Sequence, residues 1–191
     1  MPKFLIVQRS WKLTRKEEEA VKYFRLFNDA WDNFLNELRD GILVLPWVEG
    51  SIRCYLFAEC LKFMRERNFE APYQIWAEEN YGRLRADITL GSLGRGRKRV
   101  LAVEIKYVGA MDKTMRQAVE QDIRKLDEYS EHTVCGCFTM IDTSQSYKEN
   151  LDLESLGLKR QHWKWRTLTS ERVNPFDALI AWSPGFVTYE Q

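Results

Sequence analysis

Apolar residues recur at helical spacing in three segments of the chain. The first segment follows Thr14, which stands three residues before Glu17 as in a capping box, and it ends at Asp40-Gly41. Its apolar stripe is formed by Val21, Phe24, Phe27, Trp31, Phe34 and Leu38. The same periodicity predicts a second helix over about 48–67 and a third over about 112–130.

The pattern changes to that of β-strands between the second and third helices. Strands are expected at 73–78, 84–90 and 99–108. The first two are joined by a turn at 80–82, and the last two by the glycine- and arginine-rich loop 91–98. After the third helix, 133–141 is continuously apolar, which predicts a strand buried on both faces.

The last part of the chain is more mixed. Segment 142–158 is polar and is expected to be a loop with a short helix, followed by strands at 161–168 and 177–182. A strand that returns through a helix to the same sheet runs parallel to the strand before that helix. The order of elements therefore predicts a mixed α/β fold in a single domain over 1–191.

Composition narrows the classes of function. The 29 basic and 28 acidic residues nearly balance, so any nucleic-acid surface must come from local clusters of basic residues. The four cysteines and two histidines lack the spacing of a zinc site, which favours reduced thiols and a cytoplasmic location. We expect no signal peptide, and no apolar run is long enough to span a membrane, so no membrane partner is expected.

Two of the expected strands carry charged residues among apolar ones. Asp87 lies in the strand 84–90, and Glu104 and Lys106 alternate with apolar residues in the strand 99–108. Because alternate side chains of a strand share a face, Glu104 and Lys106 point to the same side, and Asp87 joins them if the strands pair as a hairpin. Two carboxylates beside an ammonium suit metal-assisted cleavage of a phosphodiester. The carboxylates hold a hard divalent cation, and the lysine orients a water or stabilises the developing charge.

This arrangement resembles the PD-(D/E)xK nuclease superfamily, whose members have the restriction-endonuclease-like fold. The matching motif is Asp87 on one strand and Glu104-Ile105-Lys106 on the next, although the proline that often precedes the family's aspartate is absent. The resemblance implies a mixed sheet with the family's αβββαβ core at 48–141. An N-terminal helical extension at 1–46 and a C-terminal elaboration at 142–191 would flank that core.

The resemblance also implies a role for each residue of the motif. Asp87 and Glu104 would bind Mg²⁺ or Mn²⁺, with the carbonyl of Ile105 as a further ligand. Lys106 would position the attacking water.

The family often adds a glutamate from the first helix of its core. Both Glu49 and Glu59 fall near the apolar stripe expected for that helix, where a carboxylate needs a partner such as a metal. Glu49 also suits the helix N-terminus as a simple charge–dipole residue, and Glu59 suits a pair with Lys62 or Arg53. We favour Glu49. Glu78 resembles an acidic position of some family branches, and it equally suits a surface charge at a strand end.

Basic residues gather at two places that suit contact with a nucleic acid. The first is a loop with Arg95, Arg97, Lys98 and Arg99. This loop either grips a phosphate backbone or forms a solvated hairpin tip. At the second place, Lys164 and Arg166 alternate with Trp163 and Trp165 along an expected strand. Either the tryptophans join the core with the basic face in solvent, or they stack on the bases of a nucleic acid.

The sequence thus predicts a metal-dependent endonuclease that uses Mg²⁺ or Mn²⁺. We expect DNA rather than RNA as the nucleic-acid partner, because most members of the superfamily that the sequence resembles cut DNA.

The long first helix suits substrate capture or a possible homodimer. On the third helix, Gln121 or Lys125 either reaches the site or stays exposed. The alternative is a catalytically silent nucleic-acid-binding or assembly subunit that retains the nuclease fold.

Overall fold

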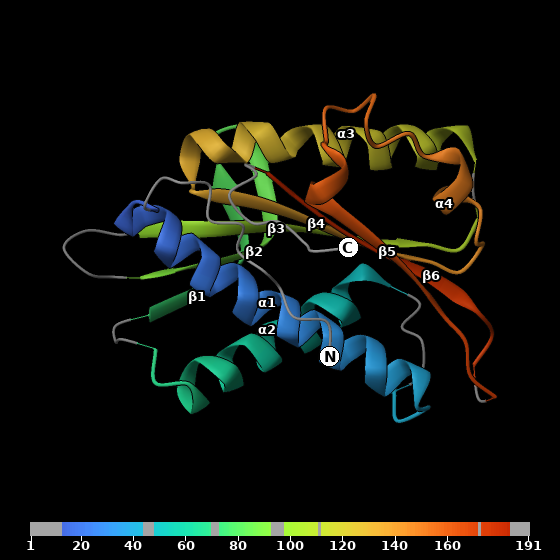
Figure 1. Cartoon of the computed structure of the whole chain (residues 1–191), viewed down its shortest axis with the longest axis horizontal. Helices are drawn as coiled ribbons and strands as arrows, with labels where there is room; N and C mark the ends of the chain where they lie inside the picture. Colours follow the sequence, from blue (N-terminus) through green and yellow to red (C-terminus); the bar gives the residue numbers. More distant parts are fainter. Residues whose placement is uncertain are drawn as a thin grey trace.

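The protein folds into three layers, with a six-stranded sheet between two layers of helices (Figure 1). The computed structural model describes residues 13–43, 48–69, 73–92, 98–110, 112–171 and 173–183. Within these ranges there are four α-helices and six strands. None of these helices is both long enough and apolar enough to cross a membrane.

The first helix, α1 (Arg15–Arg39), is fixed by its sequence at both ends. The Thr14 hydroxyl accepts the N–H of Glu17, and the Glu17 carboxylate accepts the N–H of Thr14, which confirms the expected capping box. After the helix, Gly41 has a φ of 70°, in the left-handed region that glycine adopts readily. Every residue of the predicted apolar stripe is buried.

The second helix, α2 (Glu49–Glu66), packs beside α1 on the same face of the sheet (Figure 1). Its buried residues are spaced by four along the chain: Ile52, Leu56, Cys60 and Met64. Phe24 of α1 packs against Trp182 of the sheet, with ring centroids 5.1 Å apart. The first helix therefore shares one hydrophobic core with α2 and the sheet.

The sheet has antiparallel pairs on both sides of a parallel pair. Its strands are β1 (Tyr73–Tyr81), β2 (Leu84–Ser92), β3 (Lys98–Val108), β4 (Cys135–Asp142), β5 (Trp163–Leu168) and β6 (Phe176–Ser183). Their order across the sheet is β1-β2-β3-β4-β6-β5. The parallel pair is β3 and β4, joined by the crossover helix α3 (Lys113–His132). The expected mixed α/β fold is therefore confirmed.

The crossover helix lies very close to the sheet, because β4 carries a glycine beneath it. A Cβ atom at Gly136 would lie 2.8 Å from the backbone oxygen of Leu126, so a larger residue does not fit there. Val119 and Ile123 pack against the same face of the sheet, together with the short helix α4 (Tyr147–Asn150). This close approach brings the polar residues of α3 within reach of β3.

The differences from the predicted elements are local. The first strand continues to Tyr81, so the tight turn begins at Gly82 and not at residue 80. All residues of β4 are buried, as predicted for a strand covered on both faces, although the strand begins at Cys135. Residues 93–97 of the expected loop lie outside the described residues.

Candidate functional site

The candidate site lies where β2 separates from β3. The pairing of the two strands ends at Ile88 and Val103, whereas β3 continues to Val108 alongside β4. A strand that loses its neighbour is left with backbone N–H groups that need other acceptors. The side chains that fill this gap form the candidate site.

Two carboxylates take the place of the missing strand. Asp87 Oδ2 accepts the N–H of Ile105 at 2.8 Å, and Glu49 Oε1 accepts the N–H of Tyr107 at 3.3 Å. Asp87 belongs to β2, and Glu49 is the first residue of α2. The backbone of β3 therefore fixes the positions of both carboxylates.

Arg53 of α2 links Asp87 to Glu78 of β1. Its Nη1 atom lies 3.2 Å from Asp87 Oδ1 and 2.9 Å from Glu78 Oε1, and Arg85 Nη2 lies 2.5 Å from that same glutamate oxygen. Arg85 and Arg53 together hold the pKa of the Glu78 carboxyl below its usual value. Glu78 has a φ of 54°, a left-handed conformation that is uncommon for a residue with a long side chain. The backbone of β1 is thus irregular beside Asp87.

Glu104 is buried beneath α3. The hydroxyl of Tyr129 donates to Glu104 Oε1, and Lys125 Nζ lies 3.8 Å from the same oxygen. Burial raises the pKa of Glu104 to about 8, and the nearby carboxylates of Asp87 and Asp122 add to the rise. The hydrogen bond from Tyr129 and the charge of Lys125 act in the opposite direction but do not cancel it. Without further positive charge, this carboxyl group keeps its proton at neutral pH.

Lys106 lies between two carboxylates. Its Nζ atom is 3.0 Å from Asp122 Oδ2 of α3 and 3.3 Å from Glu49 Oε1 of α2. Burial lowers the pKa of Lys106, but the two carboxylates outweigh burial and raise this pKa above its usual value. Lys106 is therefore an ammonium ion at neutral pH.

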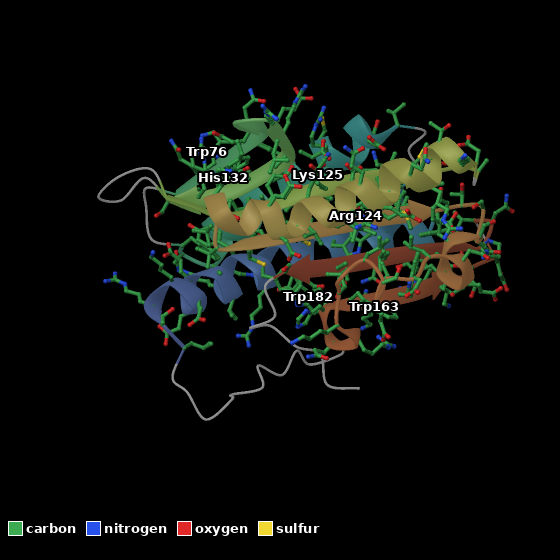
Figure 2. The ribbon with its side chains drawn as sticks, turned by 90° about the horizontal axis from the view of Figure 1, so that it is seen from above. Trp76, Arg124, Lys125, His132, Trp163 and Trp182 are labelled. Carbon is green, nitrogen blue, oxygen red and sulfur yellow. The ribbon has the colours of Figure 1, made fainter. Side chains whose placement is uncertain are left out.

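One face of α3 supplies the polar contacts to β3. Asp122, Lys125 and Tyr129 are three and four residues apart, a spacing that places them on the same side of a helix. Asp122 Oδ1 also accepts a hydrogen bond of 2.6 Å from Lys125. Figure 2 looks onto α3 and labels Lys125 on this helix. The same helix face therefore meets both Glu104 and Lys106.

The structure brings together four of the five residues expected to be catalytic. They are Asp87, Glu104, Lys106 and Glu49. The fifth, Glu59, lies between α1 and α2, where its carboxylate accepts a hydrogen bond of 3.1 Å from Asn33 and pairs with Lys62 at 3.2 Å. Ile105, expected to offer its carbonyl to a metal, lies beside Asp87 through its N–H group.

The basic loop expected to bind a nucleic acid is only partly described. Arg95, Arg97 and the side chain of Lys98 lie outside the described residues. Arg99 belongs to β3 and not to the loop. Its Nη2 atom lies 2.6 Å from Glu79 Oε1, and its guanidinium group lies over the ring of Tyr81 at 4.7 Å. Arg99 is therefore engaged within the sheet.

The basic face of β5 packs against α1 and does not face open solvent. Arg166 Nη2 lies 2.6 Å from Asp32 Oδ1 of α1. Lys164 is half-buried, and burial followed by the charge of Arg166 lowers its pKa. Trp163 and Trp165 pack against the core on the opposite side of the sheet, which is the first of the two alternatives expected for these tryptophans. In the strand order, β5 lies three positions from β3, which is about 14 Å by strand spacing.

Asp122 and Tyr129 were not singled out from the sequence as site residues. Arg53 was considered only as a partner of Glu59, and it pairs with Asp87 and Glu78 instead. Asp122 and Tyr129 carry a detectable signal, because they form a polar stripe with Lys125 beside the apolar stripe of α3. Of the two residues considered on this helix, Lys125 reaches Glu104 and Gln121 is exposed.

No family model, curated protein or solved structure matches this chain. Over the described ranges, no group of three or more histidine, cysteine, aspartate or glutamate side chains is arranged to hold a metal ion.

Glu104 should make the stability of the cation-free protein depend on pH. Between its ordinary pKa of 4.5 and about 8, the carboxyl is protonated in the folded protein and ionised in the unfolded chain. The folded state then binds more protons, so the free energy of unfolding falls as the pH rises through this window. The slope from this group is at most about 1.4 kcal/mol per pH unit. In the variant Glu104→Gln, the free energy of unfolding should change less with pH across this window. Denaturant unfolding with EDTA present measures it.

Glu128→Gln provides the control, because Glu128 is an exposed glutamate of α3, the helix that covers Glu104. Its stability should follow the pH dependence of the parent. Parallel curves for the parent and Glu104→Gln across the window would show that Glu104 ionises normally.

Proposed function

We propose that this protein is a metal-dependent nuclease with a restriction-endonuclease-like fold, which hydrolyses phosphodiester bonds. The observation that carries the proposal is that Asp87, which accepts the N–H of Ile105, lies near Glu104 where β2 separates from β3, with Lys106 two residues further along β3. The order of helices and strands also agrees with the core of that fold.

The donor atoms at the site suit a hard divalent cation. Asp87 and Glu104 offer carboxylate oxygens, and Ile105 offers a backbone carbonyl, which are the ligand types that Mg²⁺ and Mn²⁺ prefer. Among the described residues, Tyr129 and Lys125 both contact the Glu104 carboxylate at Oε1, which leaves Oε2 for a cation. Arg53 would have to leave Asp87 Oδ1 for that oxygen to bind a cation as well.

The charge balance of the site depends on the ionisation of Glu104. The acidic residues are Glu49, Glu78, Asp87, Glu104 and Asp122. The basic residues are Arg53, Arg85, Lys106 and Lys125. With Glu104 protonated, the other four acids balance the four bases, and one negative charge is left when Glu104 also ionises. A divalent cation would reverse that sign, favour the ionised form of Glu104 and attract a phosphodiester.

Lys106 serves as a donor and not as a base in this proposal. When bound, a divalent cation polarises a phosphoryl oxygen and lowers the pKa of water. Asp122 and Glu49 keep Lys106 protonated, so it has no lone pair with which to accept a proton. Its ammonium group instead orients the attacking water and stabilises the negative charge that develops on the phosphate.

A second candidate is a silent binding or assembly subunit. The support for this second candidate is that residues of the site already pair with the site's carboxylates. Arg53 pairs with Asp87, and Tyr129 donates to Glu104. Such a network would keep the fold intact without a cation.

The nuclease proposal predicts cleavage that depends on a divalent cation. The protein is incubated with single- and double-stranded DNA and RNA. It should cut DNA when Mg²⁺ or Mn²⁺ is present, and it should cut none of these substrates in EDTA.

Mn²⁺ should also raise the melting temperature of the protein. Asp87→Asn should lose both cleavage and most of this rise, because it removes a ligand charge. Lys106→Ala should lose cleavage but keep the rise and most of the substrate binding.

Asp29→Asn is the control for Asp87→Asn, because Asp29 pairs with Arg67 on the surface. Equal melting shifts in the parent and Asp87→Asn, with no substrate cut, would favour the silent subunit. Preferential cutting of RNA would change the proposed substrate and leave the roles of the residues intact.

The two glutamates of α2 offer a matched pair of variants. Glu49→Gln should lower kcat by about tenfold or more, because the Glu49 carboxylate holds both Lys106 and the N–H of Tyr107. Glu59→Gln should cut DNA like the parent. Single-turnover cleavage assays compare them directly, and a larger loss in Glu59→Gln would contradict the placement of Glu49 in the site.

A further inference from the structure

Asp122 is a buried carboxylate with a different lysine on each oxygen. Its Oδ2 atom lies 3.0 Å from Lys106 Nζ, and its Oδ1 atom lies 2.6 Å from Lys125 Nζ. Only 11% of its side chain is exposed. A carboxylate this deeply buried is costly unless it is paired, so its two partners are held firmly.

Lys106 needs such a partner to keep a single position. A lysine side chain has four rotatable bonds and an ammonium group with no preferred direction. The other anion beside it, Glu49, is 40% exposed and contacts Lys106 at the longer distance of 3.3 Å. Solvent screens an exposed pair more strongly than a buried one. Asp122 is therefore the stronger constraint on the ammonium group.

Asp122 also keeps the two lysines apart. Lys125 follows it by one turn of α3, and its ammonium group lies between Asp122 and Glu104. Because Asp122 Oδ1 pairs with Lys125 and Oδ2 pairs with Lys106, the two ammonium groups occupy separate positions. Lys125 is then directed to Glu104, and Lys106 is left as the lysine that faces Glu49 and Asp122.

We propose that Asp122 is a positioning residue that holds Lys106 in place for phosphodiester cleavage. This inference rests on the proposed nuclease function and adds α3 to the elements that build the site. Asp122 acts through Lys106 and touches neither the substrate nor the cation. Its loss should therefore slow the chemical step and leave binding unchanged.

The test compares the kinetics of Asp122→Asn with those of Glu128→Gln, in the full chain with DNA and Mn²⁺. Asn keeps the size of Asp122 but removes the charge that holds Lys106. The kcat of Asp122→Asn should fall about 10- to 100-fold. Its KM and its Mn²⁺-induced melting shift should stay near those of the parent. Glu128→Gln, on the exposed side of the same helix, should match the parent in all three. Asp122→Glu should recover part of the lost kcat, because it restores the carboxylate.

A second readout does not depend on cleavage. The melting temperatures of Asp122→Asn, Lys106→Met and the double variant form a cycle, and the two shifts should be less than additive, because the ion pair is lost only once. Additive shifts, or an unchanged kcat in Asp122→Asn when the parent cuts, would overturn the inference alone. A parent that cuts no nucleic acid with Mg²⁺ or Mn²⁺ would overturn the proposed function, and Asp122 would then be a partner in a structural ion pair only.

Discussion

The site exists because β2 separates from β3 beyond the pair Ile88 and Val103, toward Asp87 on β2 and Glu104 on β3. This separation leaves the N–H groups of Ile105 and Tyr107 without a neighbouring strand, and the carboxylates of Asp87 and Glu49 accept them. Placing carboxylates in a half-buried gap requires positive charge nearby. Arg53 and Lys106 supply it. One irregularity in a hairpin thus accounts for the gathering of charged groups.

The two helix layers meet through this gap. Glu49 and Arg53 come from α2 on one face of the sheet, and Asp122 comes from α3 on the other face. The close packing of α3 over Gly136 makes the second contact possible. Acidic and basic residues alternate along the row Glu49, Lys106, Asp122, Lys125 and Glu104. In such a row each group is held by its neighbours, so removing one charge disturbs the next.

The sequence predicts the elements well because their periodicities are strong. The stripe of α1 and the continuous apolar run of β4 each identify a buried element without knowledge of its partners. The alternation of Glu104 and Lys106 likewise identifies their shared face. The hairpin that brings Asp87 to them is a local connection, so its pairing is also accessible from the sequence.

Long-range contacts are what the sequence does not show. Glu49 and Glu59 are ten residues apart, which is about 15 Å along a helix, and only the docking of α2 decides which end meets β3. In the same way, Arg99 is paired with Glu79, and Arg166 is paired with Asp32 of a distant helix. Basic residues that look free in a sequence are thus engaged in the fold.

The proposed nuclease requires Asp87 and Glu104 together to hold a divalent cation. A crystal structure of the protein grown with Mn²⁺ tests this requirement, because anomalous scattering identifies manganese by element. The expected result is an anomalous peak in contact with both carboxylates, with Arg53 moved away from Asp87. Saturating Mn²⁺ with no peak between these residues, and with Arg53 still paired to Asp87, would contradict it.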